Sequence, residues 1–240
     1  IDCVTLANNH ALDYGPTALT DTITFLGQAG IASVGAGTDL EAARAPKVLY
    51  RPGLELAVFG VTDHPHAYSA GTARPGVAWV DLRAGVQHWL SDAVRRASRE
   101  HAVLVTPHWG PNMITQPLEG VRKAARALCD AGATLVAGHS AHVPHGVEGR
   151  VLYDLGDFVD DYATDPIVRN DLGLLFLVEL DRAGPRRLEA IPLKLDYCHT
   201  GVARGDDAAW MKRRFHAACR DLGTEVLESE ERLVITWPPS

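Results

Sequence analysis

The sequence predicts an α/β (α+β) protein in which mixed β-sheets are flanked by helices. Between Ile1 and Ala137, short apolar, β-prone runs alternate with patterns of helical spacing. From Gly146 onward, most patterns are β-like. This order is typical of a mixed sheet, or of two packed sheets with helices outside. Because the 240 residues contain no internal repeat and no convincing linker, we expect a single domain.

The N-terminal part begins with a predicted βαβ pattern. Two strands, Ile1–Ala7 and Ile31–Val34, flank a helix that starts at Pro16 and ends at Gly30. Proline suits a first helical turn because its missing N–H costs nothing there, and apolar residues follow at helical spacing. Asp39 is expected to cap a short helix with its side-chain oxygen.

The middle of the chain continues the alternation and contains one long loop, Thr62–Val80, which is rich in Gly, Pro and His. Loops of this length are usually functional or mobile. We predict a hairpin before the loop, with strands Lys47–Tyr50 and Leu54–Val61, and after it a helix, Asp81–Arg99, capped by its first residue. The next expected elements are strand Ala102–Pro107, helix Leu118–Ala131 and strand Ala133–Ala137.

The C-terminal part is predicted to be mostly β. Two short strands surround the turn Glu148-Gly149-Arg150, and the segment Asp157–Asn170 is irregular and acidic. The last expected elements are strands Leu172–Leu180, Arg187–Tyr197 and Arg232–Trp237 and helix Asp206–Leu222.

Charge and composition argue against several classes of protein. The formal net charge is -7 and the basic residues are scattered, which disfavours a nucleic-acid-binding surface. The four cysteines show no CxxC spacing, which favours a reducing, cytoplasmic location. No apolar run reaches the about 20 residues that span a bilayer. The chain begins without Met inside a strand-like segment, so we expect further sequence upstream of Ile1, and any signal or membrane anchor would lie there.

Histidines mark the ends of three predicted strands. Each of the runs Asn8-Asn9-His10, His108-Trp109-Gly110 and Gly138-His139-Ser140-Ala141-His142 follows an apolar, β-prone stretch. In α/β sheets ligands bind at the carboxyl ends of strands, and imidazole is a common ligand for Zn, Mn and Fe. We therefore predict one metal site supplied by several strand ends. Four other histidines are interpreted as ordinary surface or semi-buried residues: His88, His101, His199 and His216. The same interpretation is preferred for three loop histidines, but a role in the site stays open for them: His64, His66 and His145.

An ordered set of motifs resembles the CapA family of capsule and poly-γ-glutamate biosynthesis. The resemblance covers roughly residues 4–160 and begins with Leu6-Ala7-Asn8-Asn9-His10-Ala11-Leu12-Asp13-Tyr14-Gly15. The family is similar to the calcineurin-like metallophosphoesterases. This implies a metallophosphatase-like four-layer sandwich, with two packed mixed β-sheets flanked by helices. The later motifs are Gly30 to Gly37, His108-Trp109-Gly110, Asp130 to Ala133, Gly138 to Val143, Glu148 and Leu155-Gly156-Asp157-Phe158.

The resemblance also implies that the site binds two divalent metal ions, which would be Mn, Zn or Fe, and it implies which residues bind them. Asn9 would bind one metal through its amide oxygen, His108 and His139 would bind that same metal, and His142 would bind the other. Two such ions lower the pKa of a bridging water and stabilise a developing oxyanion. The superfamily's two Asp-containing metal motifs would lie upstream of Ile1, so the chain is expected to lack the N-terminal portion of its domain.

The catalytic and substrate-binding residues are expected beside these ligands. His10 would donate a proton to the leaving group or stabilise charge, and Asp13 is placed to hold its ring. Asn8, His145 and Asp157 are predicted to contact substrate. Asp157 replaces the family's usual Asn, and its role as an added metal ligand, a base or a substrate contact stays open.

The leading functional hypothesis is a metal-dependent hydrolase that acts on a small-molecule or peptide-like amide, or on a phosphoester. The alternatives are a metallophosphoesterase proper, and a non-catalytic accessory protein that binds an acidic polymer or a synthetase partner. The chain also contains an acidic cluster: Asp157, Asp160, Asp161 and Asp165. These carboxylates either attract a cationic substrate or belong to an ordinary solvated loop.

Overall fold

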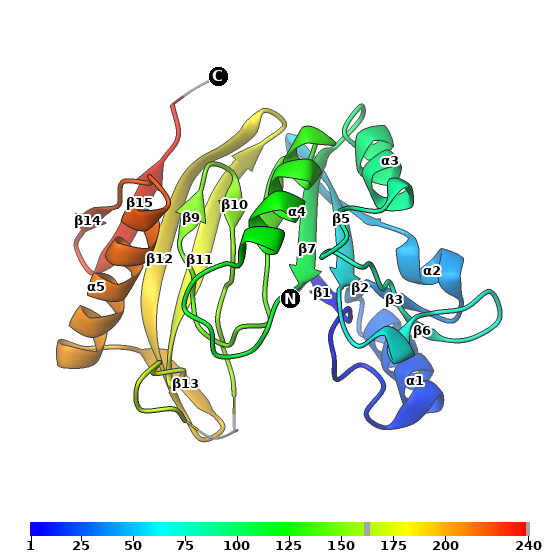
Figure 1. Ribbon diagram of the computed structural model, residues 1–240, viewed down its shortest axis with the longest axis horizontal. Helices are drawn as coiled ribbons and strands as arrows, with labels where there is room; N and C mark the ends of the chain where they lie inside the picture. Colours follow the sequence, from blue (N-terminus) through cyan, green and yellow to red (C-terminus); the bar gives the residue numbers. More distant parts are fainter. Residues whose placement is uncertain (161–163, 239–240) are drawn as a thin grey trace. The chain divides into compact units, whose positions relative to one another are not determined.

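The computed structural model describes residues 1–160 and 164–238, and the chain divides into two compact units (Figure 1). The first unit comprises Ile1–Trp109 and Glu119–Val136. The second comprises Gly110–Leu118 and the chain from Ala137 on. Several sheets flanked by helices confirm the α/β (α+β) class. The single domain stays a prediction.

The first unit is built on a mixed sheet in which β4, β5, β7 and β8 are neighbours in that order. β4 and β5 are antiparallel, as the predicted hairpin requires, whereas β5, β7 and β8 are parallel. Because parallel strands end at the same edge, β5 and β7 bring Thr62 and His108 into register at their carboxyl ends. The strands span Lys47–Arg51 (β4), Leu54–Thr62 (β5), Ala102–His108 (β7) and Leu135–Ala137 (β8).

A two-stranded parallel sheet carries the N-terminal motif. β1 (Cys3–Thr5) pairs with β2 (Ala32–Val34), and α1 (Gly15–Gln28) connects them, which confirms the predicted βαβ pattern. The sheet approaches β5 closely, because a Cβ added to Gly60 would lie 2.6 Å from Thr5 Oγ1. Glycine at this position therefore permits the contact.

The long loop predicted at Thr62–Val80 contains short regular elements. The 3-10 turn η1 (His66–Tyr68) precedes β6 (Gly76–Val77), which pairs with β3 (Ala36–Gly37). Leu19 of α1 packs against this pair, so the loop is tied to a hydrophobic cluster.

The short helix α2 (Leu40–Arg44) begins where the sequence predicts. The Asp39 carboxylate accepts the backbone N–H of Ala42 at 2.8 Å and caps it. α4 (Glu119–Asp130) also agrees with prediction and buries one apolar face: Val121, Ala124, Ala125 and Leu128.

The predicted start of the next helix at Asp81 is wrong. α3 spans only His88–Ala97. Asp81 instead accepts the backbone N–H groups of Arg83 and Ala84 within a turn. Gly85 follows with φ 109°, a conformation in which a right-handed helix cannot continue.

The second unit contains a β-hairpin and a larger sheet covered by one helix. Every pairing in the larger sheet is antiparallel, whereas the resemblance implied that it would be mixed. The exposed strands β13 and β14 have no counterpart in the sequence prediction. α5 (Gly205–Asp221) buries Met211, Phe215 and Cys219 and contacts β11 and β12 (Figure 1). The strands span Val147–Glu148 (β9), Val151–Leu152 (β10), Leu172–Asp181 (β11), Gly184–Asp196 (β12), His199–Val202 (β13), Leu227–Ser229 (β14) and Arg232–Thr236 (β15).

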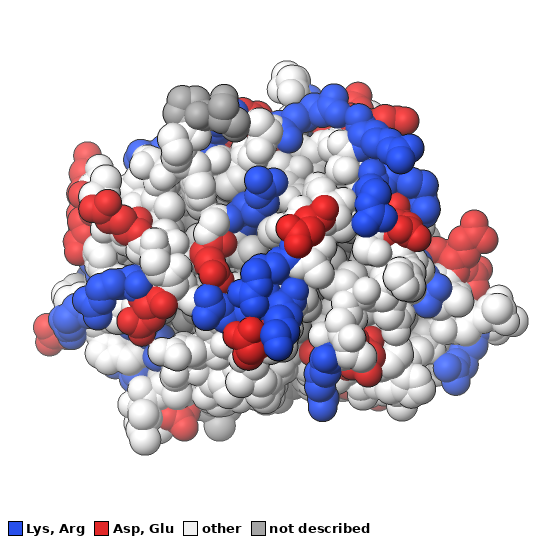
Figure 2. Space-filling view, turned by 45° about the horizontal axis from the view of Figure 1, so that its top comes forward, with Lys and Arg blue, Asp and Glu red and all other residues white. Residues whose placement is uncertain are grey.

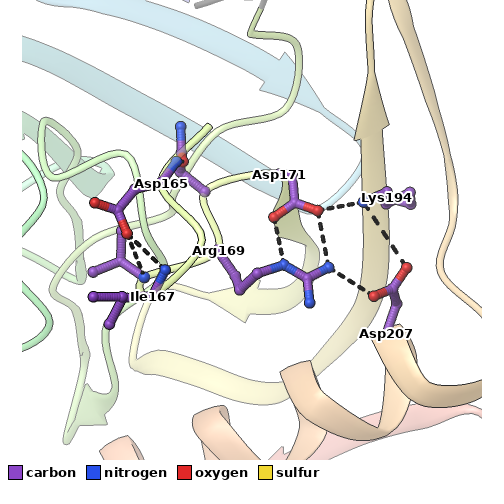
Figure 3. Close-up of polar contacts among 8 residues, drawn as sticks. Asp165, Ile167, Arg169, Asp171, Lys194 and Asp207 are labelled. Atoms are coloured by element: carbon purple, nitrogen blue, oxygen red, sulfur yellow. Dashed lines mark hydrogen bonds and ion pairs between the residues drawn. The ribbon is translucent and has the colours of Figure 1, made fainter. Parts of the chain in front are cut away.

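An ion network joins the start of β11 to β12 and α5 (Figure 3). The Arg169 guanidinium donates to both carboxylate oxygens of Asp171, at 2.7 and 2.9 Å, and to Asp207 at 2.7 Å. Lys194 contacts Asp171 and lies 3.9 Å from Asp207. The Arg169 contact is the main reason why the pKa of Asp171 falls to about 2.

This network makes part of the stability dependent on pH. The Asp171 side chain is only 10% exposed, and its folded pKa of about 2 lies below its ordinary value of 3.8. Its stabilising effect, on the order of 2 kcal/mol, is therefore complete above pH 4 and is lost as the pH falls towards 2. We expect Asp171→Asn to be less stable than wild type at pH 7 and the difference to shrink below pH 4, by urea unfolding. An exposed control, Asp196→Asn, should show neither effect, and equal pH dependence of both variants would contradict the assignment.

Acidic and basic side chains are interspersed on the face drawn in Figure 2. Groups of Lys and Arg lie beside Asp and Glu there, and neither sign covers the face alone. Among the helices of the described residues, none has the length and apolarity needed to cross a membrane.

Candidate metal and catalytic site

In the first unit, the chain leaves β1 through a turn that presents Asn8, Asn9 and His10. The Asn8 side-chain oxygen accepts the His10 backbone N–H at 2.9 Å, which is a reason for Asn at this position. This oxygen is thus already engaged, and substrate binding by Asn8 stays a prediction. Asn9 is partly exposed.

The predicted contact between Asp13 and His10 is present. His10 Nδ1 lies 2.7 Å from Asp13 Oδ2, and the Tyr68 hydroxyl donates to Asp13 Oδ1 at 3.3 Å. Asp13 therefore holds the ring of His10 from its Nδ1 side. Both residues are exposed, so the imidazole is accessible to a substrate.

Two imidazoles meet where β5 and β7 end, also in the first unit. His108 is buried at the end of β7, and its carbonyl accepts the Asp63 backbone N–H at 3.0 Å. The His64 ring lies beside it, with 4.8 Å between the two ring centroids. The sequence did not distinguish His64 from other loop histidines.

In the second unit, the loop Gly138–His142 is held by a buried acid. The Asp154 carboxylate accepts the backbone N–H groups of Ala141 and Gly156, at 2.8 and 2.9 Å. Burial raises the pKa of Asp154 to about 7. Sequence reasoning missed Asp154, although an Asp inside the predicted pair of strands, 146–155, was a usable signal.

The backbone of this loop is unusual where it presents its histidines. Ser140 and His142 have φ values of 134° and 64°. The Ser140 hydroxyl donates to the Gly110 carbonyl at 3.0 Å, which helps to hold this conformation. Non-glycine residues with positive φ often lie in functional sites.

His139 and His142 occupy opposite electrostatic environments. Burial lowers the pKa of His139 to about 4, and its Nε2 is inaccessible to solvent. A neutral imidazole is the form that binds a metal. By contrast, the pKa of His142 is raised, chiefly by its hydrogen bond to Asp157.

His142, Asp157 and Asp160 form a group whose potential ligand atoms all lie within 4.8 Å of one another. His142 Nδ1 lies 2.9 Å from Asp157 and 3.9 Å from Asp160. The two carboxylates are only 14% and 10% exposed. One imidazole and two carboxylates are a donor set that suits Zn, Mn or Fe, so these residues fit a divalent ion.

The other predicted contact residues lie elsewhere in the second unit. His145 is buried and its Nε2 donates to the Ile114 carbonyl at 2.9 Å, while burial lowers its pKa to about 4. These contacts give His145 a structural role, and substrate binding by it stays a prediction. In the predicted acidic cluster, Asp165 accepts the N–H groups of Ile167 and Val168, and Asp161 lies outside the described residues.

Comparison with known proteins agrees with the motifs. The profile of the family described as "Bacterial capsule synthesis protein PGA_cap" matches residues 1–162. The chain belongs to this family. The CapA-like resemblance is thereby confirmed.

The curated relatives carry related names. A "probable polyglutamine synthesis accessory protein" of Mycobacterium tuberculosis is 35% identical over 97% of this chain and 66% of its own length. The PGA biosynthesis protein CapA of Bacillus subtilis is 33% identical over 79% of this chain and 50% of its own length. The capsule biosynthesis protein CapA of Bacillus anthracis is 28% identical over 79% of this chain and 47% of its own length. The chain thus spans about half to two thirds of the relatives that it matches.

Proposed function

We propose that this member of the PGA_cap family is a metal-dependent hydrolase that acts on an amide, peptide-like or phosphoester substrate. The observation that carries the proposal is the group formed by His142, Asp157 and Asp160. A divalent metal ion held by these three residues would supply Lewis acidity and an activated water near neutral pH.

The charges around His142 favour a bound cation. Asp157 and Asp160 lie close to each other and are mostly buried, and buried Asp154 adds a third carboxyl group beside them. Buried like charges are costly unless a counter-charge lies between them. A protonated His142 supplies one positive charge, and a divalent ion would supply more.

The ligands expected from the family fit this proposal within each unit. In the first unit, Asn9 follows β1 and His108 is the last residue of β7. His139 and His142 lie in the loop after β8, held by Asp154. We propose these four residues as metal ligands, with two divalent ions as the expected number.

His10 is proposed as the general acid. Its Nδ1 lies against Asp13, and Nε2 is the nitrogen that we propose to donate a proton to the leaving group. The distance of 2.7 Å between His10 Nδ1 and Asp13 Oδ2 supports a positioning role for Asp13.

The names of the relatives suggest one substrate class and one alternative. PGA biosynthesis, in the name of the B. subtilis protein, suggests an amide or peptide-like substrate by family-level analogy. The words "accessory protein" in the mycobacterial name favour the alternative of a non-catalytic protein that binds an acidic polymer or a synthetase.

Metal analysis combined with hydrolysis assays tests the proposal. The purified chain should retain Mn, Zn or Fe after dialysis, by elemental analysis. It should hydrolyse either a γ-glutamyl amide or bis-nitrophenyl phosphate, and EDTA should abolish this activity. A protein that binds no transition metal and hydrolyses neither substrate would exclude the hydrolase and leave the accessory role.

A further inference from the structure

The end of β5 places a second imidazole beside His108. We propose that His64, oriented by Asp63, is a further ligand to the metal that His108 binds. This rests on the proposed metal dependence and extends it to two residues of the long loop.

The strand register brings His64 to His108. β5 and β7 are parallel, and Thr62 pairs with His108 at their common end. The chain stays attached beyond this pair, because the Asp63 N–H donates to the His108 carbonyl at 3.0 Å. Imidazoles that share a metal through bonds of about 2.1 Å have ring centroids roughly 5 Å apart. The 4.8 Å between the His64 and His108 centroids is consistent with a common ion.

Two side-chain hydrogen bonds hold the backbone around His64. The Thr62 hydroxyl, which is fully buried, donates to the His64 carbonyl at 2.6 Å. The Trp79 indole N–H donates to the Asp63 carbonyl at 3.0 Å. The position of the His64 backbone is thus determined on both sides by buried or half-buried groups.

Asp63 fixes the orientation of the imidazole. Its side chain is only 5% exposed, and its carboxylate contacts His64 Nδ1. A carboxylate on one ring nitrogen is the usual outer-shell partner of a metal-bound histidine, because it selects the tautomer and leaves the other nitrogen for the metal. Among the described residues, none forms a hydrogen bond with His64 Nε2 that would compete with a ligand role.

His66 provides a matched control on the same loop. It is exposed and packs edge-on against Trp79, with 4.4 Å between the centroids. It therefore shares the loop and the residue type with His64. Its ring packs on Trp79, whereas the ring of His64 contacts Asp63 and lies beside His108.

The test is calorimetric titration of Zn²⁺ or Mn²⁺ into the metal-stripped chain, together with the visible spectrum of its Co²⁺ form. We expect His64→Ala to weaken metal binding by at least about 100-fold and to change the Co²⁺ spectrum, and Asp63→Asn to weaken it about 10- to 100-fold. His66→Ala should bind as wild type. Thermal unfolding of the stripped proteins shows whether each variant folds, and His64→Gln replaces His64→Ala if that variant does not.

Two outcomes would overturn the assignment in distinguishable ways. If His108→Ala loses metal while the His64 and Asp63 variants bind it with wild-type affinity and spectrum, His64 is not a ligand but the proposed function stands. If the wild-type chain binds no metal, the proposed function fails and this inference fails with it.

Discussion

Replacing His142 with alanine is expected to lower metal affinity in the second unit by at least about 100-fold. The change removes the only nitrogen from the group that His142 forms with Asp157 and Asp160. Such a loss should exceed the 10- to 100-fold effect typical of outer-shell residues. Metal content after dialysis and calorimetric titration measure it.

The role of Asp157 separates two versions of this site. If Asp157 only orients His142 through the 2.9 Å hydrogen bond, Asp157→Asn should weaken binding about 10- to 100-fold. If it is itself a ligand, the loss should equal that of His142→Ala. His199→Ala, an exposed histidine of β13, is the control and should bind normally. Unchanged metal affinity in the His142 and Asp157 variants would refute the site.

Metal binding at this site should also tighten as the pH rises. The hydrogen bond with Asp157 raises the pKa of His142 above its ordinary value of 6.5, so a proton competes with the metal until the pH exceeds that raised value. Titrations at a series of pH values check the direction. An affinity that is independent of pH would mean that metal binding does not displace a proton from His142.

Replacing His10 with alanine is expected to lower kcat about 10²- to 10⁴-fold without loss of metal. The reason is that a general acid acts in the transition state, and this is its usual contribution. Asp13→Asn should reduce kcat less, because the ring keeps its nitrogen but loses the partner that holds it at 2.7 Å. Steady-state kinetics and metal analysis of the same preparations measure both quantities.

The leaving group provides the discriminating control for His10. Nitrophenolate leaves without a proton, so His10→Ala should matter much less on nitrophenyl substrates than on substrates with poor leaving groups. His88→Ala, an exposed histidine at the start of α3, should behave as wild type. Equal losses on both kinds of leaving group, or loss of metal, would assign His10 a different role.

Local patterns predicted the elements and the main motifs well. The hairpin of β4 and β5, the cap at Asp39 and the helix α5 each follow from residues close together in the chain. The helix predicted from Asp81 failed because the sequence pattern did not reveal that the backbone turns at Gly85. The short strands β13 and β14 are exposed and have little apolar pattern to reveal them.

The histidine-bearing strand ends were visible in the sequence because an apolar run that stops at an imidazole is a local signal. The acids that serve these histidines were harder to identify. Asp154 reaches back to Ala141, and Asp160 approaches His142 from a segment that reads as a solvated acidic loop. These contacts depend on the path that each loop takes after its strand. The residue types in the loop do not predict that path.

The sequence by itself determined the family, the order of the main strands and helices, and the histidines at the ends of β1, β7 and β8. Each of these depends on neighbouring residues or on short motifs. Only the tertiary structure decided which acids partner those histidines. Asp157 joins His142 after a turn through the hairpin, and Asp63 holds His64 against His108 because β5 and β7 run in parallel. Strand pairing and burial bring side chains that are distant in sequence into contact, and these contacts determine the chemistry of the candidate site.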